Sequence, residues 1–276
     1  MSKTKDRMRE NNLRYKQNLG QNFIYDDRVL ESLAEAAEIS PQEDVLEVGP
    51  GAGSLTGKLC DRAGHVLAVE LDERLIPLLQ AFLAEKRNLT LIQGDIMTLD
   101  LKKETAVLRK PYAVVANIPY YITTPLILRL LDEGDSISRM CLMVQKEVAE
   151  KILSKPGREG WGPMAIRCQY YCEPSLAVSV PAECFTPPPK VDSAFILLRR
   201  RTAPPIQVKD TEQFFHVVNA AFALRRKTML NNLCATFRVD RDTAMGWLET
   251  AGLDEKTRGE KMTMEELARL SDAMTP

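Results

Sequence analysis

The stretch that decides the fold is DVLEVGPGAG, residues 44–53. Its first half is a short apolar run interrupted only by Glu47, which predicts a strand buried inside a sheet. Its second half has glycine at every second position, which predicts a tight turn whose backbone can adopt positive φ and approach a ligand closely. A buried strand that leads into such a turn indicates a sheet whose ligand lies at the carboxyl ends of the strands.

The residues that follow continue this alternation of strand and helix. We expect further strands at 65–70, 89–92, 112–116 and 139–144, and helices at 54–62, 71–86, 123–134 and 146–153. Strands that alternate with helices predict a parallel, doubly wound α/β sheet. Pro77 fits the helix over 71–86 only if it lies in the first turn.

A second region begins after residue 203. Residues 203–205 are Ala-Pro-Pro, which is typical of a linker, and the rest of the chain has helical periodicity. The expected helices there are 211–224, 227–237, 241–251 and 263–274. We therefore predict a ligand-binding α/β domain over 1–203, with a basic N-terminal arm, and a small all-helical domain over 204–276.

Composition excludes several classes of protein. The 276 residues are 45% hydrophobic and 27% charged, as in globular proteins and unlike disordered chains. No apolar run approaches the roughly 18 residues of a membrane span, and residues 1–16 carry no secretory signal. The six cysteines form no CxxC pair and only two histidines occur, so no disulfide framework or metal site is expected. We expect a cytoplasmic protein that binds neither a membrane nor a metal.

The net charge of −1 conceals an uneven distribution. Residues 1–18, 190–209 and 225–238 each carry a net charge of +4, whereas residues 26–110 carry −6. A basic segment is often only a solvated surface. Three of them in one chain favour an RNA or DNA partner, because Lys and Arg displace counterions from the phosphate backbone.

Acidic residues follow the strands next to the glycine turn. The turn itself departs from the dinucleotide pattern GxGxxG, since position 54 is serine. Glu70 ends the second strand, where a carboxylate can bind both ribose hydroxyls of an adenosine-bearing cofactor. Asp95 ends the third strand and can accept from the adenine amino group. Either acid alone could be a helix N-cap. Together they predict a nucleoside pocket, and they do not distinguish NAD from S-adenosylmethionine.

The tetrapeptide Asn117-Ile118-Pro119-Tyr120 makes that distinction. The amide oxygen of Asn117 and a nearby backbone carbonyl can accept the two hydrogens of an exocyclic amine. Pro119 fixes the backbone, and Tyr120 can stack on a planar base. This arrangement suits an adenine N6 amine that attacks a methyl sulfonium, a reaction that needs alignment and the removal of water more than a strong base. It disfavours an NAD-dependent dehydrogenase.

With these motifs in place, the sequence closely resembles the ribosomal small-subunit RNA adenine dimethyltransferases. The matching stretches are LGQNF (19–23), LEVGPGAGSLT (46–56), ELD (70–72), GDIM (94–97), NIPY (117–120), MVQKEVAE (143–150), FxPxPxVDSA (185–194) and RKTxxNxL (226–233). The resemblance implies a seven-stranded, Rossmann-like methyltransferase sheet with a helical C-terminal domain. It also implies transfer of four methyl groups from S-adenosylmethionine to the N6 amines of two adjacent adenosines in the loop of the 3′-terminal hairpin of 16S ribosomal RNA.

The resemblance assigns roles by motif position. The cofactor-binding residues are Asn22, Ile24, Gly49, Gly51, Glu70, Asp95 and Asn117. The catalytic residues that hold the target amine are Asn117, Pro119 and Tyr120. The RNA-binding candidates are Phe185, Lys190, Arg225, Arg226 and Lys227. Phe185 would stack on the flipped adenine, and its alternative role is that of a core phenylalanine. The expected partner is 16S ribosomal RNA in the small subunit or its precursor, bound by a monomer with a part in small-subunit biogenesis.

Two other functions remain open from the sequence. A 23S ribosomal RNA methylase that confers macrolide resistance shares the fold and the NIPY motif, although residues 185–194 and 226–228 favour the small-subunit enzyme. A ribosome-assembly or transcription factor that binds RNA without catalysis is the second. It would be expected to have a degraded glycine turn or NIPY motif, and both are intact. The assembly role can coexist with methylation.

Overall fold

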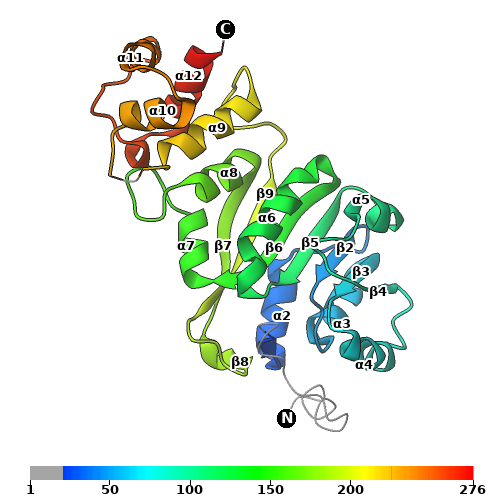
Figure 1. Cartoon of the computed structure of the whole chain (residues 1–276). Helices are drawn as coiled ribbons and strands as arrows, with labels where there is room; N and C mark the ends of the chain where they lie inside the picture. The colour runs from blue at the N-terminus through cyan, green and yellow to red at the C-terminus, as the bar shows by residue number, and fades with distance from the viewer. Residues whose placement is uncertain (1–20, 225, 276) are drawn as a thin grey trace. The chain divides into compact units, whose positions relative to one another are not determined.

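The computed structural model describes residues 21–224 and 226–275, so the arm over 1–18 and Arg225 lie outside the described residues. The chain forms two compact units (Figure 1). The α/β unit comprises the described residues up to 149 together with 173–200, and the helical unit comprises 150–172 and the described residues from 201. The sequence predicts a single division after residue 203. It does not show that 150–172 belongs with the helices that follow.

A seven-stranded sheet forms the centre of the α/β unit (Figure 1). In spatial order its strands are β4 (Leu89–Gln93), β3 (His65–Glu70), β2 (Asp44–Val48), β5 (Tyr112–Asn117), β6 (Ile137–Gln145), β9 (Ser193–Arg200) and β7 (Cys172–Val180). Strands β2 to β6 are parallel, and β9 runs antiparallel to β6. The expected α/β class and the seven strands are confirmed. The carboxyl ends of β2, β3 and β5 meet at one edge of the sheet, where open α/β sheets bind ligands.

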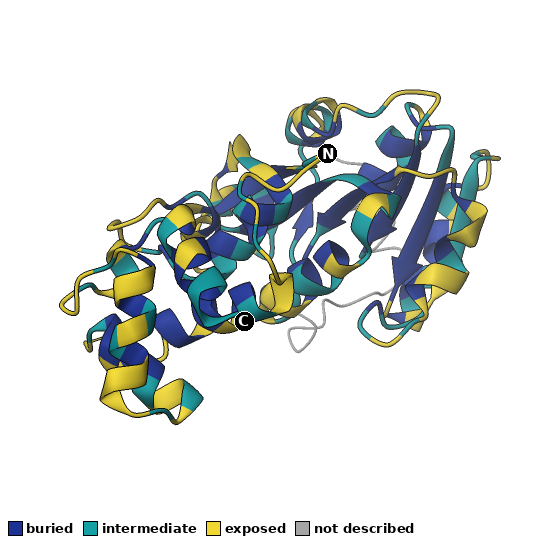
Figure 2. Cartoon of the chain, turned by 90° about the horizontal axis from the view of Figure 1, so that it is seen from above, coloured by how far each residue is buried: buried dark blue, intermediate teal, exposed yellow. Residues whose placement is uncertain are grey.

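Burial on both faces of the sheet explains why the sequence predicts the strands. Every residue of β2 is buried, and in β5 all but the last residue are buried (Figure 2). Helices α2 (Asp27–Ala36) and α3 (Ser54–Cys60) contribute to one shared core with the strands, which contains Leu33, Leu59, Val66, Val115 and Met143. Helix α6 (Thr123–Asp132) buries Leu126, Ile127, Leu130 and Leu131.

Several elements differ from the expectation. The helix expected over 71–86 is shorter: a 3-10 turn, η2 (Glu73–Leu75), precedes α4 (Ile76–Phe82), and Pro77 lies in the first turn of α4. The remaining elements of this unit are α5 (Leu101–Glu104), η3 (Thr105–Val107), η4 (Tyr120–Ile122), η5 (Gly134–Ser136), α7 (Lys146–Ile152), whose last residues fall in the helical unit, η6 (Ala182–Cys184), and the two-stranded pair β1 (Phe23–Ile24) and β8 (Phe185–Thr186).

The helical unit has its own core. It contains α8 (Pro163–Tyr171), α9 (Thr211–Ala221), α10 (Met229–Phe237), α11 (Arg241–Thr250), η7 (Gly259–Lys261) and α12 (Met264–Met274). Phe214, Leu233, Leu248 and Leu267 are fully or almost fully buried together. The helix starts are capped: Asp210 and Asp240 accept from the first backbone N–H groups of α9 and α11, and a capping box at Thr263 begins α12.

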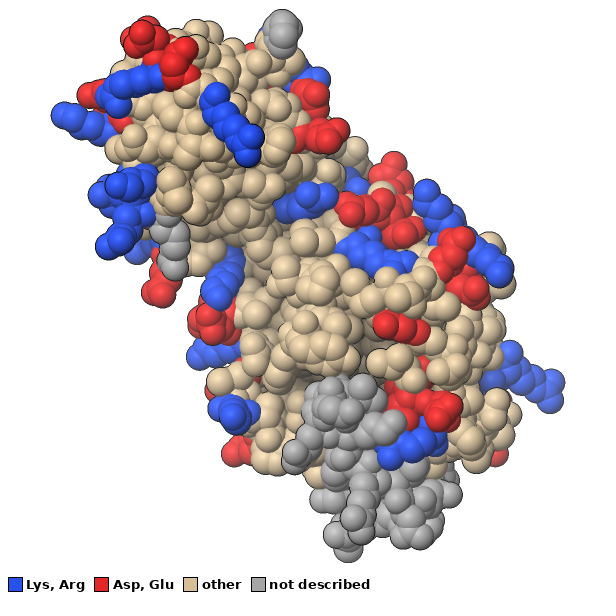
Figure 3. All heavy atoms as spheres, viewed as in Figure 1, with Lys and Arg blue, Asp and Glu red and all other residues tan. Residues whose placement is uncertain are grey.

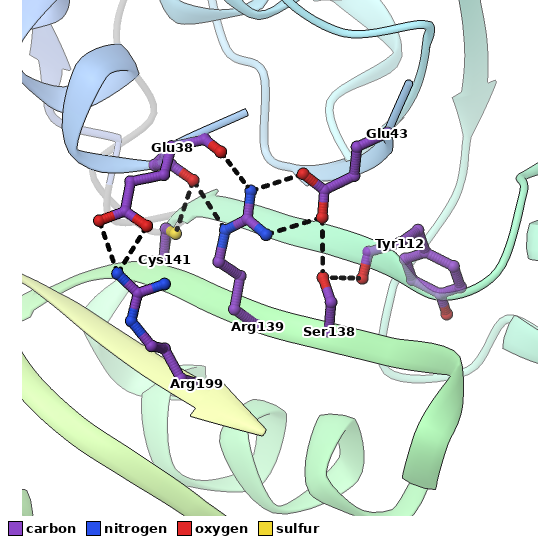
Figure 4. A network of polar contacts seen from close by, with 8 residues as sticks. Glu38, Glu43, Tyr112, Ser138, Arg139, Cys141 and Arg199 are labelled. Atoms are coloured by element: carbon purple, nitrogen blue, oxygen red, sulfur yellow. Dashed lines mark hydrogen bonds and ion pairs between the residues drawn. The ribbon is translucent and has the colours of Figure 1, made fainter. Parts of the chain in front are cut away.

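A polar network fixes the segment that joins α2 to β2 (Figure 4). Arg139, on β6, donates from Nε to the carbonyl of Ala37 at 2.9 Å. Its Nη1 and Nη2 donate to the two carboxylate oxygens of Glu43 at 2.7 and 2.6 Å. The side chains of this ion pair are only 12% and 15% exposed. Glu38 also pairs with Arg199 of β9, but the side chains of Glu38 and Arg199 are 49% and 45% exposed. The network positions the start of β2, and with it the glycine turn.

Arg139→Ala should lower the free energy of unfolding by about 3 kcal/mol, because it leaves a largely buried carboxylate unpaired. The matched control is Arg199→Ala, which breaks an exposed pair on the neighbouring strand and should cost less than about 1 kcal/mol. Denaturant unfolding of both variants measures the difference. Equal losses would show that burial does not determine the strength of the network.

Candidate active site

One pocket lies at the carboxyl ends of β2, β3 and β5, within the α/β unit. Its lining includes every residue assigned above to the cofactor or to catalysis: Asn22, Ile24, Gly49, Gly51, Glu70, Asp95, Asn117, Pro119 and Tyr120. These residues come from five separate segments of the sequence. The fold therefore brings together residues that the sequence could only group by motif.

The glycine turn uses both properties of glycine. Gly49, Gly51 and Gly53 have φ of +70°, +58° and +81°, a region that other residues rarely adopt. In addition, a Cβ on Gly51 would lie 2.5 Å from Cε1 of Phe23, so the ring of Phe23 can cover the turn only because residue 51 is glycine. Gly53 then serves as the N-cap position of α3.

Glu70 connects the ends of two strands. Its Oε2 accepts from the backbone N–H of Gly51 at 3.0 Å, and its Oε1 accepts from the N–H of Asp72 at 2.8 Å. Burial raises the pKa of Glu70, whereas these two backbone hydrogen bonds oppose the rise. Each oxygen keeps a further lone pair. The carboxylate can therefore hold the turn and still accept from two hydroxyl groups in the pocket.

Two buried polar groups in the pocket wall are unsatisfied. Among the described residues, Oε2 of Glu47 and Oγ of Ser54 have no hydrogen-bond partner, and both residues line the pocket. Glu47 is 2% exposed, and burial, with a smaller contribution from the charge of Glu70, raises its pKa to about 8. Buried polar atoms normally have partners. A pocket with these groups in its wall fits a ligand that carries a cation or hydrogen-bond donors.

The pKa of Glu47 predicts a pH dependence of stability. The folded protein retains a proton that the unfolded chain releases above its ordinary pKa of 4.5. The raised pKa therefore stabilises the fold most at low pH, and this contribution is lost as the pH rises from 4.5 to about 8.

Glu47→Gln should remove this contribution and flatten the decline in the free energy of unfolding, measured by denaturant unfolding of the ligand-free protein from pH 5 to pH 8. Glu85→Gln, at an exposed position, should follow the wild-type curve. Parallel curves for Glu47→Gln and the wild type would contradict the prediction.

Asp95 lines the same pocket from the end of β4. Its Oδ1 accepts from the N–H of Met97 at 2.8 Å. This contact caps a turn, whereas the alternative that the sequence left open was the N-cap of a helix. It engages one carboxylate oxygen, so capping of the turn and contact with a ligand are compatible.

The Asn117 amide has a defined orientation. Its Nδ2 donates to the backbone carbonyl of Asn22 at 3.0 Å, which leaves Oδ1 as the acceptor that the side chain can offer to the pocket. Pro119 follows with φ −56° and ψ 130° and occupies the N-cap position of the short turn η4. The hydroxyl of Tyr120 lies 2.7 Å from Oγ of Ser193, and burial raises the pKa of Tyr120. An amide acceptor and an aromatic ring thus border the same pocket.

The comparison with known families agrees with this geometry. A family model for ribosomal RNA adenine dimethylases matches residues 12–275. This chain belongs to the ribosomal RNA adenine dimethylase family.

Individual members of the family are similar over nearly the whole chain. The Ribosomal RNA small subunit methyltransferase A of Enterococcus faecalis is 41% identical, covering 99% of this chain and 95% of the relative. The protein of the same name from Clostridium botulinum (strain Langeland) is 42% identical, covering 98% of both chains.

Two solved structures share the fold. The 23S rRNA methyltransferase ErmE superimposes with a TM-score of 0.71 at 29% identity, covering 92% of this chain and 100% of the other. A dimethyladenosine transferase from Plasmodium falciparum superimposes with a TM-score of 0.77 at 24% identity, covering 90% and 95%, and this likeness concerns the fold alone. The Rossmann-like methyltransferase sheet is thereby confirmed, and the chain is an RNA methyltransferase of this family.

The RNA-binding candidates differ in burial: one is in the core, and the others that the structure describes are exposed. Phe185 is 3% exposed, pairs with Ile24 across the two-stranded sheet and belongs to the core of the α/β unit. This position corresponds to the core phenylalanine that the sequence left as its alternative role. Lys190 is exposed on the loop before β9, and Arg226 and Lys227 are exposed before α10.

Basic residues that the sequence did not single out lie close to Arg226 and Lys227. The N–H of Met229 donates to the carbonyl of Thr257 at 2.7 Å, and the N–H of Gly157 donates to that of Glu260 at 2.8 Å. These bonds bring three segments of the helical unit together. The exposed bases on them, which we call the basic cluster, are Lys155, Arg158, Arg226, Lys227, Lys256, Arg258 and Lys261. Lys and Arg side chains gather on one side of this unit in Figure 3. Only a folded chain reveals this cluster, because its members are far apart in sequence.

Within the described ranges, no group of three or more His, Cys, Asp or Glu side chains could hold a metal ion. Each helix in those ranges is too short or too polar to cross a membrane.

Proposed function

We propose that this chain transfers methyl groups from S-adenosylmethionine to the N6 amines of two adjacent adenosines in the loop of the 3′-terminal hairpin of 16S ribosomal RNA. The observation that carries the proposal is the single pocket lined by the glycine turn, Glu70, Asp95 and the NIPY residues. Curated relatives about 41% identical over nearly the full chain are named small-subunit methyltransferases. We further propose that the protein acts as a cytoplasmic monomer in small-subunit biogenesis.

The pocket wall fits the cofactor. The two ribose hydroxyls would donate to Glu70, the adenine amino group to Asp95, and the charged amino acid portion would lie near Gly49 and the unsatisfied Glu47. Asn22 and Ile24 would cover the bound molecule from the segment before α2. When bound, S-adenosylmethionine supplies an electrophilic methyl group on a cationic sulfur.

The NIPY residues would orient the target amine. Oδ1 of Asn117 accepts one N6 hydrogen and a backbone carbonyl beside Pro119 accepts the other, which directs the nitrogen lone pair toward the methyl group. Tyr120 stacks on the adenine ring. A tight pocket aligns the amine with the methyl group and excludes water, which is the main contribution that a methyl transfer requires. After transfer, the nitrogen carries a positive charge and loses one proton to solvent water, because the amide and backbone carbonyl oxygens accept hydrogen bonds but are too weakly basic to take the proton.

The target base has to leave its hairpin loop to enter the pocket, which costs a few kcal/mol and is offset by stacking and hydrogen bonds. The basic cluster of the helical unit, with Lys190 on the α/β unit, would bind the phosphate backbone. Arg225 lies outside the described residues and remains a candidate from the sequence alone.

The alternatives are less well supported. ErmE is 29% identical to this chain, well below the small-subunit relatives, so the fold it shares does not favour a 23S substrate. A purely RNA-binding assembly factor would not need the unsatisfied polar groups and positive-φ glycines that this pocket retains.

A methylation assay on small subunits that lack the modification tests the proposal. The wild-type chain should dimethylate two adjacent adenosines of 16S RNA, located by mass spectrometry, and Asn117→Ala should lower the rate at least 100-fold because the amine loses its acceptor. Circular dichroism checks the fold of the variant. Methylation of 23S RNA alone, or near-normal activity of Asn117→Ala, would refute the assignment.

The basic cluster predicts the salt dependence of RNA binding. Arg226→Gln combined with Lys227→Gln should reduce the slope of the logarithm of the binding constant against the logarithm of the salt concentration by about 1 to 2. Each phosphate contact releases about one counterion on binding, and the variant makes up to two contacts fewer. The control is Lys102→Gln with Lys103→Gln, which removes two exposed charges from α5 of the other unit. An unchanged slope in the first variant would remove the basic cluster from the interface.

A further inference from the structure

Ser193 contacts Tyr120, although the two residues lie far apart in the sequence. It is the first residue of β9, is 2% exposed, and its Oγ lies 2.7 Å from the Tyr120 hydroxyl. We propose that Ser193 is a positioning residue, which acts through Tyr120 by fixing the plane of the ring on which the target base stacks. This inference rests on the proposed function and extends it to a residue that the motif roles do not include.

Ser193 is itself held in a defined position. It pairs with Gln145 at the end of the β6–β9 ladder. The residue before it, Asp192, is fixed twice: its carbonyl accepts from the N–H of Lys146 at 3.0 Å, and its Oδ1 accepts from the N–H of Ala182 at 3.0 Å. Three backbone segments therefore converge just before Ser193. Its hydroxyl is a fixed reference point within the α/β unit.

Tyr120, by contrast, lies in a weakly constrained segment. It begins η4, a three-residue 3-10 turn without a side-chain cap, and such turns have poor hydrogen-bond geometry. The next residue, Tyr121, is 58% exposed, so it packs little against the rest of the unit. The bond to Ser193 holds the ring of Tyr120 at its hydroxyl end, and a half-buried phenolic hydroxyl needs such a partner.

The contact also connects catalysis with RNA binding. Residues 187–192 form the loop that leads to Ser193, and this loop carries the exposed Lys190 and Val191. A phosphate bound by Lys190 would therefore be linked to the stacking ring through a few backbone bonds and one hydrogen bond. In this proposal, Ser193 connects the two functions.

Steady-state methylation by Ser193→Ala, Tyr120→Phe and the double variant tests the proposal. Each single variant removes the same bond and should lower kcat about 5- to 10-fold, which corresponds to about 1.0 to 1.4 kcal/mol. KM for the RNA should stay within about twofold, because the loss concerns orientation of the bound base. The double variant should be no slower than the slower single variant, since the two changes remove one shared interaction.

Thr105→Val is the matched control. Thr105 is also a buried hydroxyl residue of the α/β unit, and its Oγ1 donates to the carbonyl of Leu101 at 2.6 Å, but it does not line the pocket. The variant should lose stability without a change in kcat. Ser193→Thr, which keeps the hydroxyl, should restore most of the activity. If Ser193→Ala does not fold, Tyr120→Phe alone tests the bond from its other side.

An unchanged kcat in Ser193→Ala or in Tyr120→Phe, or multiplicative losses in the double variant, would overturn the positioning role. Failure of the proposed function is a separate outcome: the wild-type chain would then methylate 23S RNA or no RNA. If the wild type methylates 23S RNA, the ratios of variant to wild-type kcat are measured on that RNA and still test the role of Ser193. If the wild type methylates no RNA, both the function and the role of Ser193 are refuted.

Discussion

The carboxylate of Glu70 is the constraint on which the site depends. It accepts backbone hydrogen bonds from Gly51 and Asp72, at the ends of two neighbouring strands, and its side chain is almost fully buried. In such surroundings hydrogen bonds are stronger than in water, and an unpaired group is more costly. The glycine turn can therefore adopt its three positive-φ conformations against a fixed partner, and the pocket opens between the two strand ends.

A segment that precedes the sheet completes the pocket. Gln21 donates to Asp72 at 3.0 Å, the carbonyl of Asn22 accepts from Asn117, and the ring of Phe23 covers Gly51. Successive residues of this segment thus contact the ends of β3, β5 and β2. The cofactor-side and target-side residues belong to one connected set of contacts, which explains how residues from separate parts of the chain can act on one methyl group.

Sequence patterns predicted the strands because residues buried on both faces form continuous apolar runs, as in 44–48 and 65–70. Local patterns could not show that α4 ends at Phe82, or that α2 forms although its apolar residues are set among charged ones. Likewise, the burial of Phe185 depends on its pairing with Ile24, far away in the sequence. The contact of Ser193 with Tyr120 and the basic cluster have the same origin: they exist only when distant segments meet.

A crystal structure of the chain with S-adenosylhomocysteine bound tests the proposed site most directly. We expect both ribose hydroxyls to donate to the Glu70 carboxylate, the adenine amino group to lie within hydrogen-bond distance of Asp95, and the sulfur to face Asn117. A ligand bound outside this pocket, or a ribose that points away from Glu70, would contradict it.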